Sequence, residues 1–162
     1  MTRIAEHELP STSAEAPNGN ADGEVPLRPG EQAIAQARLQ ALPNPSRHRD
    51  YLLHFSYPEF TCKCPRTGYP DFALIKLWVL PDHSIVELKS LKLYLNRYRD
   101  AYIFHEEATN RILDDLVAAI EPKWARIEAG WNPRGNLKTS VTAEHQPQNR
   151  PATLAESHSA DT

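Results

Sequence analysis

The chain of 162 residues has little of what would mark a secreted, membrane-bound or nucleic-acid-binding protein. Its only two cysteines, Cys62 and Cys64, lie two positions apart and cannot form the disulfide framework of a small secreted domain. No apolar run approaches the roughly 20 residues of a membrane-spanning helix, and no apolar stretch follows the N-terminus as in a signal peptide. The net charge of -3 gives no general attraction to nucleic acid or anionic membranes. We expect a soluble, reduced, cytoplasmic protein.

Large apolar side chains are scarce at both ends of the chain. Residues 1–30 are mainly Ala, Pro, Ser, Gly, Asn and Glu, a composition that buries too little surface to offset chain entropy. Residues 30–42 have a helical composition with weak apolar positions, ended by Pro43 and Pro45. We therefore expect a disordered extension over residues 1–45, one folded domain over residues 46–143 and a disordered polar tail over residues 144–162.

Strand and helix patterns follow one another within the expected domain. Strands are predicted at 51–55 and 72–80, with a short extended segment at 84–87. Helical spacing of apolar residues predicts one helix from Leu88 and a second over about 105–120, followed by strands at 124–131 and 137–143. This order, β-β-α-α-β-β, predicts an α+β fold with a four-stranded antiparallel sheet and two helices on one face. So small a core, with three Trp and six Tyr, favours an oligomer.

The segment 59–72 holds the first candidate site. Cys64 is a candidate nucleophile, because the cationic neighbours Lys63 and Arg66 would favour its thiolate. Asp71, seven residues later, is a candidate proton donor if it is partly removed from water. One alternative is a small buried cysteine and an aspartate that caps a turn. Another is a zinc site, in which Cys-x-Cys would need further ligands from His54, His83 or His105.

Two further segments are candidates for ligand binding. The start of a helix at residues 87–94, with Lys89 and Lys92 one turn apart, suits a phosphate, although exposed lysines on a helix are often only solvated. At 104–107, the carboxylate of Glu106 could accept two parallel hydrogen bonds from a guanine-like edge. The alternative is that acidic residues simply stabilise the first turn of a helix.

Taken together, these segments closely resemble the NADPH-dependent 7-cyano-7-deazaguanine reductases, the nitrile reductases of queuosine biosynthesis, in their short single-domain form. The likeness runs over about residues 49–134, with order and spacing kept. The motifs that carry it are Glu59-Phe60-Thr61 with Cys64-Pro65-x-Thr67-Gly68-x-Pro70-Asp71-Phe72-Ala73, then Glu87-Leu88-Lys89-Ser90-Leu91-Lys92-Leu93-Tyr94, then Phe104-His105-Glu106. The resemblance implies a tunnelling fold (T-fold), in which subunits form rings with sites between neighbours.

The resemblance also implies the chemistry and its residues. NADPH would reduce the nitrile to an amine through a covalent thioimidate on Cys64, with Asp71 as the proton donor and without a metal. The substrate contacts fall on Val86, Glu87, Leu88, His105 and Glu106, and the cofactor contacts on Lys89, Ser90, Lys92 and Arg134. The sequence departs from the family pattern at residues 96–97 and at Asn136, which bears on cofactor contacts. The rival interpretations are a zinc-dependent GTP cyclohydrolase-like hydrolase of the same fold and a non-catalytic deazapurine-binding protein.

Overall fold

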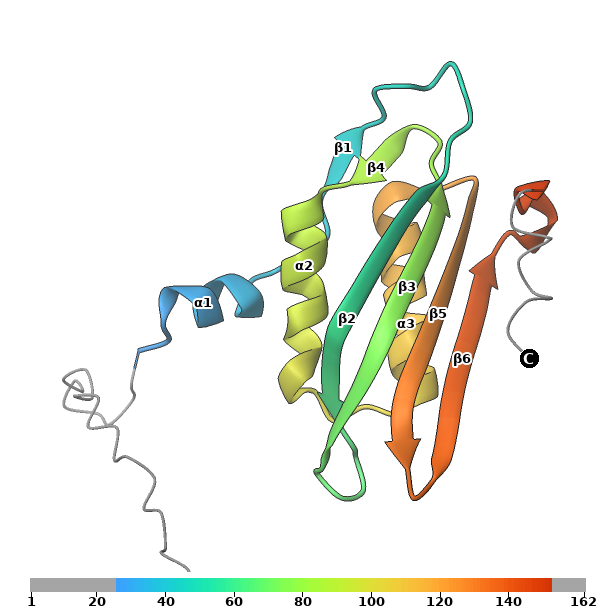
Figure 1. The fold of residues 1–162 in the computed structure, drawn as a ribbon. Helices are drawn as coiled ribbons and strands as arrows, with labels where there is room; N and C mark the ends of the chain where they lie inside the picture. The colour runs from blue at the N-terminus through green and yellow to red at the C-terminus, as the bar shows by residue number, and fades with distance from the viewer. Residues whose placement is uncertain (1–25, 153–162) are drawn as a thin grey trace, which may run out of the picture.

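The computed structural model describes residues 26–152, and its main body is a sheet covered by two helices (Figure 1). Strands β2 (Leu53–Lys63), β3 (Pro70–Leu80), β5 (Trp124–Arg134) and β6 (Leu137–His145) form the antiparallel sheet in the order β2-β3-β5-β6. Helices α2 (Leu88–Asn96) and α3 (His105–Ile120) lie on the same face of it, joined by the 3-10 turn η1 (Arg97–Asp100). The predicted order β-β-α-α-β-β and the antiparallel sheet are confirmed.

The core fills the space between the sheet and the two helices. On β3, alternate residues are buried and point to the helices, as the two-residue period of a strand requires. The apolar stripe predicted for α3 supplies the opposite wall. The buried side chains of these two elements include Ala73, Ile75, Leu77, Val79, Ile112, Leu113, Leu116 and Ile120. Because Asp71 shares the inward-facing positions of β3, it lies at the end of the core rather than in solvent.

The strands of the sheet are longer than predicted. Pairing of β2 with β3 continues to Lys63 through a register shift between Tyr57 and Phe60. A bulge of this kind accommodates Pro58, which lacks the N–H group that a regular ladder needs. As a result Cys62 lies within a strand, and only residues 64–69 form the connection between β2 and β3.

The structure departs from the disorder expected for residues 1–45. Residues 26–45 carry α1 (Pro29–Ala35) and β1 (Ala41–Pro43), and β1 pairs antiparallel with β4 (Ser84–Val86). Asn44 is buried, donates to the carbonyl of Asp82 and accepts from the hydroxyl of Tyr51. These bonds pair the buried polar groups of Asn44 and so hold in place a short segment that has no hydrophobic core of its own. Residues 1–25 lie outside the described part of the chain.

The C-terminal segment also departs from expectation. Glu144 and His145 complete β6, and η2 (Pro147–Asn149) follows, whereas residues 153–162 lie outside the described part. Within residues 26–152, no helix is long and apolar enough to cross a membrane. The domain bounds at 46 and 143 stay a prediction.

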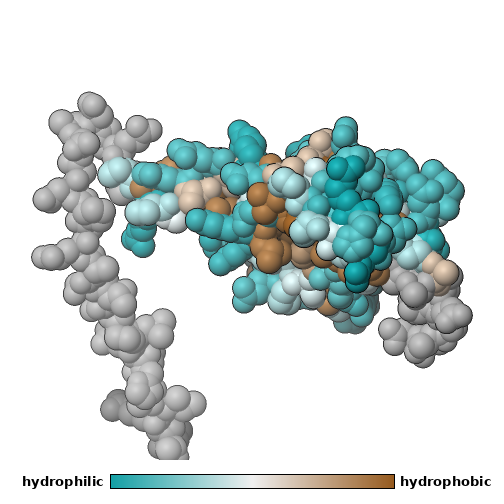
Figure 2. Space-filling view, turned by 90° about the horizontal axis from the view of Figure 1, so that it is seen from above, coloured by the Kyte–Doolittle hydropathy of each residue, from teal (hydrophilic) through white to brown (hydrophobic). Residues whose placement is uncertain are grey.

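The end of the domain that carries β1 and β4 exposes apolar surface. Figure 2 looks onto this end and shows apolar side chains near its centre, surrounded by polar ones. Leu42 of β1 and Leu88 at the start of α2 are two of the large exposed apolar residues, 44% and 65% accessible. This surface lies far from the β2–β3 connection, which is at the other end of the sheet (Figure 1).

Candidate active site

A cavity of about 350 Å³ opens at the end of the sheet where the β2–β3 connection, the start of α3 and the end of β5 meet (Figure 1). It brings together five of the residues predicted to form the site. Its lining consists of Cys64, Pro65, Thr67, Asp71, Ile103, Phe104, His105, Glu106 and Arg134. The predicted nucleophile, the predicted proton donor and part of the predicted substrate site therefore share one cavity.

A short parallel backbone bridge assembles this cavity. Lys63, the last residue of β2, pairs with Tyr102 in the segment before α3. The N–H of Lys63 donates to the carbonyl of Ala101 at 2.9 Å, and the N–H of Ile103 donates to the carbonyl of Lys63 at 3.1 Å. The bridge aligns the residues that follow on each side, so that Cys64 and His105 enter the same space.

The connection that carries Cys64 is a tight turn that supports a thiolate. The N–H of Gly68 donates to the carbonyl of Cys64 at 2.8 Å, and Gly68 has a φ of 74°, which suits glycine. The hydroxyl of Thr67, followed by the backbone N–H groups of Arg66 and Thr67, lowers the pKa of the Cys64 thiol. Sequence reasoning had assigned this effect to the charges of Lys63 and Arg66. In the structure Lys63 instead pairs with Asp100 at 2.8 Å.

The second cysteine has a different environment. Cys62 is fully buried, and its thiol lies 3.8 Å from the carbonyl oxygen of Ile103. Burial raises the pKa of the Cys62 thiol to about 12. Of the two thiols, only that of Cys64 is therefore suited to act as a nucleophile near neutral pH.

Asp71 lies between two nitrogen-bearing side chains. Its carboxyl group is 7% exposed, with Oδ1 at 2.5 Å from a guanidinium nitrogen of Arg134 and Oδ2 at 3.4 Å from Nε2 of His105. His105 stacks flat on the buried ring of Trp131, with centroids 3.8 Å apart and planes 7° apart. Stacking fixes the imidazole of His105, so its position beside Asp71 is set by the core.

The remaining predicted residues lie at the end of β4 and in the first turns of α2, away from this cavity. Leu88 shares a groove with His54 and Phe55 near the start of β2, whereas Cys64 follows its end. Phe55 and Lys63 are eight positions apart along β2, which is on the order of 25 Å at the usual rise per residue. Lys89 and Lys92 are exposed, and Val86 is buried. A single chain therefore does not bring Glu87 and Cys64 into one site.

The backbone N–H groups at the start of α2, which the sequence suggested as a phosphate site, are instead bonded to the side chain of Glu87. Its carboxylate accepts from the backbone N–H of Lys89 at 2.9 Å and of Ser90 at 2.6 Å. These two bonds, that of Lys89 first, hold the pKa of Glu87 below its usual value. The carboxylate of Glu87 therefore caps these N–H groups, and charge for a phosphate on this helix comes from the side chains of Lys89 and Lys92.

Ser90 is buried, and its hydroxyl is used within the fold. It donates to the backbone carbonyl of Glu87 at 2.7 Å and accepts from the N–H of Gln40 at 3.1 Å. The backbone N–H of Glu87 in turn donates to the carbonyl of Gln40 at 2.8 Å. Ser90 thus joins the start of α2 to the segment before β1, which favours a structural role over the predicted contact with the cofactor.

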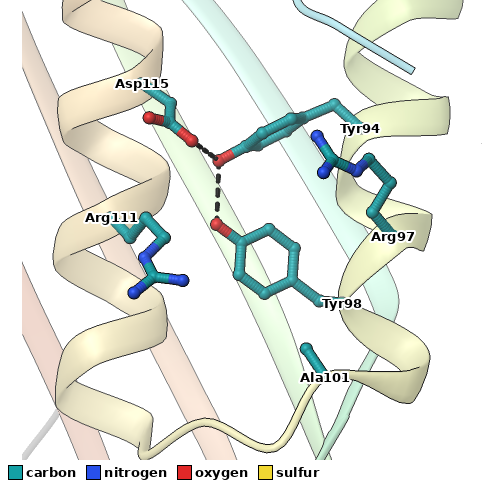
Figure 3. A pocket seen from close by; sticks show the side chains of 6 residues that line it. All are labelled: Tyr94, Arg97, Tyr98, Ala101, Arg111 and Asp115. Atoms are coloured by element: carbon teal, nitrogen blue, oxygen red, sulfur yellow. Dashed lines mark hydrogen bonds between the residues drawn. The ribbon is translucent and has the colours of Figure 1, made fainter. Parts of the chain in front are cut away.

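A second pocket, between α2 and α3, contains none of the predicted site residues (Figure 3). It measures about 150 Å³. The hydroxyl of Tyr94 donates to Asp115 at 2.6 Å and lies 2.8 Å from the hydroxyl of Tyr98. Burial, followed by the bond to Asp115, raises the pKa of Tyr94. This network fastens the two helices to each other.

No three His, Cys, Asp or Glu side chains in the described residues 26–152 are grouped as metal ligands would be. His54 stacks on Trp78, with ring centroids 4.9 Å apart, and His83 pairs with Asp82 at 2.9 Å. Of the three histidines proposed as zinc ligands, only His105 lines the cavity of Cys64.

Comparison with known proteins places the chain in a family. A model of the family described as QueF-like protein matches residues 70–150. A protein of Gloeothece citriformis is 52% identical over 124 residues, which cover 76% of this chain and 90% of that protein. One of Thermosynechococcus vestitus is 50% identical over 122 residues, covering 75% and 92%. Both relatives are named NADPH-dependent 7-cyano-7-deazaguanine reductase.

A solved structure shares the fold. The crystal structure of an archaeosine synthase QueF-Like in the apo form aligns with a TM-score of 0.54 and 20% identity, over 57% of this chain and 91% of that chain. At this identity the likeness concerns the fold alone, and with the family match it confirms the predicted T-fold. The chain therefore belongs to the QueF-like family, as its likeness to the 7-cyano-7-deazaguanine reductases predicted.

Proposed function

We propose that this protein reduces the nitrile of 7-cyano-7-deazaguanine to an aminomethyl group with NADPH, as a cytoplasmic enzyme of queuosine biosynthesis. One observation carries the proposal. The half-buried thiol of Cys64, whose pKa is lowered, and the buried carboxyl group of Asp71 line the same cavity. A nucleophile and a proton donor in one cavity are what addition to a nitrile requires.

Cys64 and Asp71 together carry out the first step, which is addition of the thiol to the nitrile. The sulfur of Cys64 attacks the nitrile carbon, so that an S–C bond forms and one C–N π bond breaks. The nitrogen takes its proton from Asp71, which leaves a thioimidate on the enzyme. NADPH, when bound, supplies the hydride for each of the two reductions that follow. After the first reduction Cys64 leaves as a thiolate, and its lowered pKa makes it a good leaving group.

Glu106 and Glu87 would hold the purine-like edge of the substrate. A carboxylate accepts two parallel hydrogen bonds from a ring N–H and an exocyclic NH₂ group. Glu106 is exposed in the first turn of α3 and lines the cavity with Cys64. Glu87 lies at the opposite end of the domain from Cys64, so its contribution has to come from a second copy, together with those of Val86 and Leu88.

The cations of α2 suit the phosphates of NADPH. Lys89 and Lys92 are both exposed and one helical turn apart, and neither forms an ion pair within the described residues. Arg134 lines the cavity of Cys64. With Lys89 and Lys92 of one copy and Arg134 of another, the cofactor would lie across the boundary between two chains.

The surface of α2 and β2 supports assembly of this kind. A groove of about 290 Å³ runs between them, and its apolar side chains include Phe55, Tyr57, Leu88, Leu91 and Leu95. β2 and β6 are the edge strands of the sheet, so each has a row of backbone groups available to another strand. We therefore propose a homo-oligomeric ring in which neighbouring copies complete each site.

Subunit mixing tests whether the site is shared. Cys64→Ala and Glu87→Gln should each be inactive alone, and co-assembly of the two variants should restore activity at boundaries that combine both intact halves. The control is co-assembly of Cys64→Ala with Asp71→Asn, which affect the same half and should restore nothing. Failure of the first pair to recover any activity, with mixed oligomers verified by mass, would contradict the shared site.

The reaction itself is tested by stoichiometry. Purified protein with 7-cyano-7-deazaguanine should consume two NADPH for each aminomethyl product, measured by absorbance and by mass spectrometry of the product. The Cys64→Ala variant is the control and should consume none. Hydrolysis of GTP together with about one bound zinc per chain, measured by elemental analysis, would contradict the proposal in favour of a cyclohydrolase.

A further inference from the structure

Arg134 contacts the predicted proton donor, whereas the resemblance to the reductases implied a contact with the cofactor. It ends β5, just before the turn at Gly135 and Asn136, which have φ values of 55° and 67°. From there its guanidinium reaches across to β3, where it lies 2.5 Å from Oδ1 of Asp71 and donates to the carbonyl of Pro70 at 2.6 Å. Arg134 is 45% exposed, whereas Asp71 is 7% exposed. In this pair Asp71 is therefore held in the protein interior, whereas Arg134 is accessible from solvent.

The contact with Arg134 leaves Asp71 unable to donate through Oδ1. A guanidinium has only donors, so the oxygen that it contacts must accept and does not carry the proton. The other oxygen, Oδ2, faces Nε2 of His105 at 3.4 Å. Both oxygens are therefore engaged within the protein. For Asp71 to give a proton to a substrate nitrogen through Oδ1, Arg134 has to move away.

We propose that Arg134 couples cofactor binding to the proton donor: it pairs with Asp71 in the free enzyme and exchanges that carboxylate for a phosphate of NADPH. This inference rests on the proposed function. A phosphate offers a guanidinium two parallel hydrogen bonds and more charge than one carboxylate oxygen does. The exchange frees Oδ1 of Asp71, so formation of the S–C bond of Cys64 and transfer of the proton to the nitrile nitrogen become faster once the cofactor is in place.

Adduct formation without reduction tests the coupling. The probe is NADP⁺, which has the phosphates of NADPH but no hydride to give. In the whole oligomer mixed with 7-cyano-7-deazaguanine, the thioimidate absorbance should rise faster with NADP⁺ than without it. The expected factor is about 5- to 150-fold, the usual range of coupling between two sites. In Arg134→Met, which keeps length but has no donors, formation should already be fast without NADP⁺ and unchanged by it.

A matched control separates this effect from a general loss of charge. Lys138 is an exposed cation on the same hairpin, and Lys138→Met should behave as the unmodified protein does. Slow adduct formation by Arg134→Met without NADP⁺ would overturn the coupling. So would a rate of adduct formation in the unmodified protein that does not change when NADP⁺ is added. Either result would leave the proposed function unaffected. Absence of any adduct in the unmodified protein would overturn the proposed function itself.

A binding measurement tests the same inference without depending on the Arg134 variant. Asp71→Asn removes the charge that competes for Arg134, so NADP⁺ should bind more tightly to this variant, again by about 5- to 150-fold. Isothermal titration of NADP⁺ into the oligomer measures it. A residue that only supports the fold, or only donates a proton, would not tighten cofactor binding when replaced. Unchanged or weaker binding by Asp71→Asn would overturn the inference.

Discussion

Replacing Asp71 by Asn separates its chemical role from its structural one. Asn keeps the shape of the side chain and can still accept from Arg134 through its amide oxygen, but it has no acidic proton to give. Loss of a general acid costs about 10²- to 10⁴-fold in rate. At about 1.36 kcal/mol for each factor of ten, the barrier rises by about 2.7 to 5.4 kcal/mol.

The structural cost of Asp71→Asn has to be measured beside the rate. Asp71 is buried and its carboxylate pairs with the guanidinium of Arg134, so weakening this contact costs about 1–3 kcal/mol of stability. Thermal unfolding of the oligomer measures this term. Calorimetry measures substrate binding, which should persist because Glu106 and Glu87 are unchanged. The steady-state rate, taken well below the unfolding temperature, should then fall by at least about 10²-fold.

Near-normal turnover by Asp71→Asn would refute this assignment. His105 would then be the proton donor, since its Nε2 lies 3.4 Å from Asp71 and it lines the same cavity. The matched variant is His105→Phe, which keeps an aromatic ring against Trp131 and removes the titratable nitrogen. If Asp71 is the donor, Asp71→Asn should be slower than His105→Phe in single-turnover reduction.

The other predictions concern the two thiols and the helix pair. Cys64→Ala should abolish turnover and adduct with the fold intact, whereas Cys62→Ala should retain much of the activity; the reverse result would show that the nucleophile was misassigned. The rate at which iodoacetamide modifies Cys64 should increase with pH and reach its midpoint below the usual thiol pKa of about 8.5, because the pKa of Cys64 is lowered. Thr67→Val should shift this midpoint to higher pH, because it removes the hydroxyl that lowers the pKa. Cys62, with a pKa of about 12, should react only on unfolding, as peptide mass mapping would show. Tyr94→Phe should lower stability by about 1–3 kcal/mol in urea unfolding, since it leaves the hydroxyl of Tyr98 and the carboxylate of Asp115 without that partner; an unchanged midpoint would contradict a structural role for the network.

The sequence predicted the parts of the fold that depend on local periodicity. The helix at 105–120 was predicted with the bounds it has, because its apolar stripe and the following Pro122 are both local signals. The pairing of β1 with β4 was not predicted, since three-residue strands joined over about 40 positions have no periodic pattern to detect. The extension of β2 to Lys63 was missed because Pro58 interrupts its pattern and the bulge depends on β3.

The site could be predicted as a set of residues but not as a geometry. Motif order and spacing pointed to Cys64, Asp71, His105 and Glu106, which lie together. The contact of Arg134 with Asp71 joins positions 63 residues apart, and only the register of β5 against β3 brings them close. The role of Thr67 had a local signal, a hydroxyl three residues after Cys64, which was outweighed by the more obvious charges of Lys63 and Arg66.

The measurement that tests the central claim most directly is the mass of the intact chain after mixing with 7-cyano-7-deazaguanine without NADPH. The account predicts an increase equal to the mass of the substrate, because addition of the thiol to the nitrile loses no atoms. Peptide mapping should locate the adduct on Cys64, and addition of NADPH should remove it. A chain of unchanged mass, or an adduct on Cys62, would contradict the account.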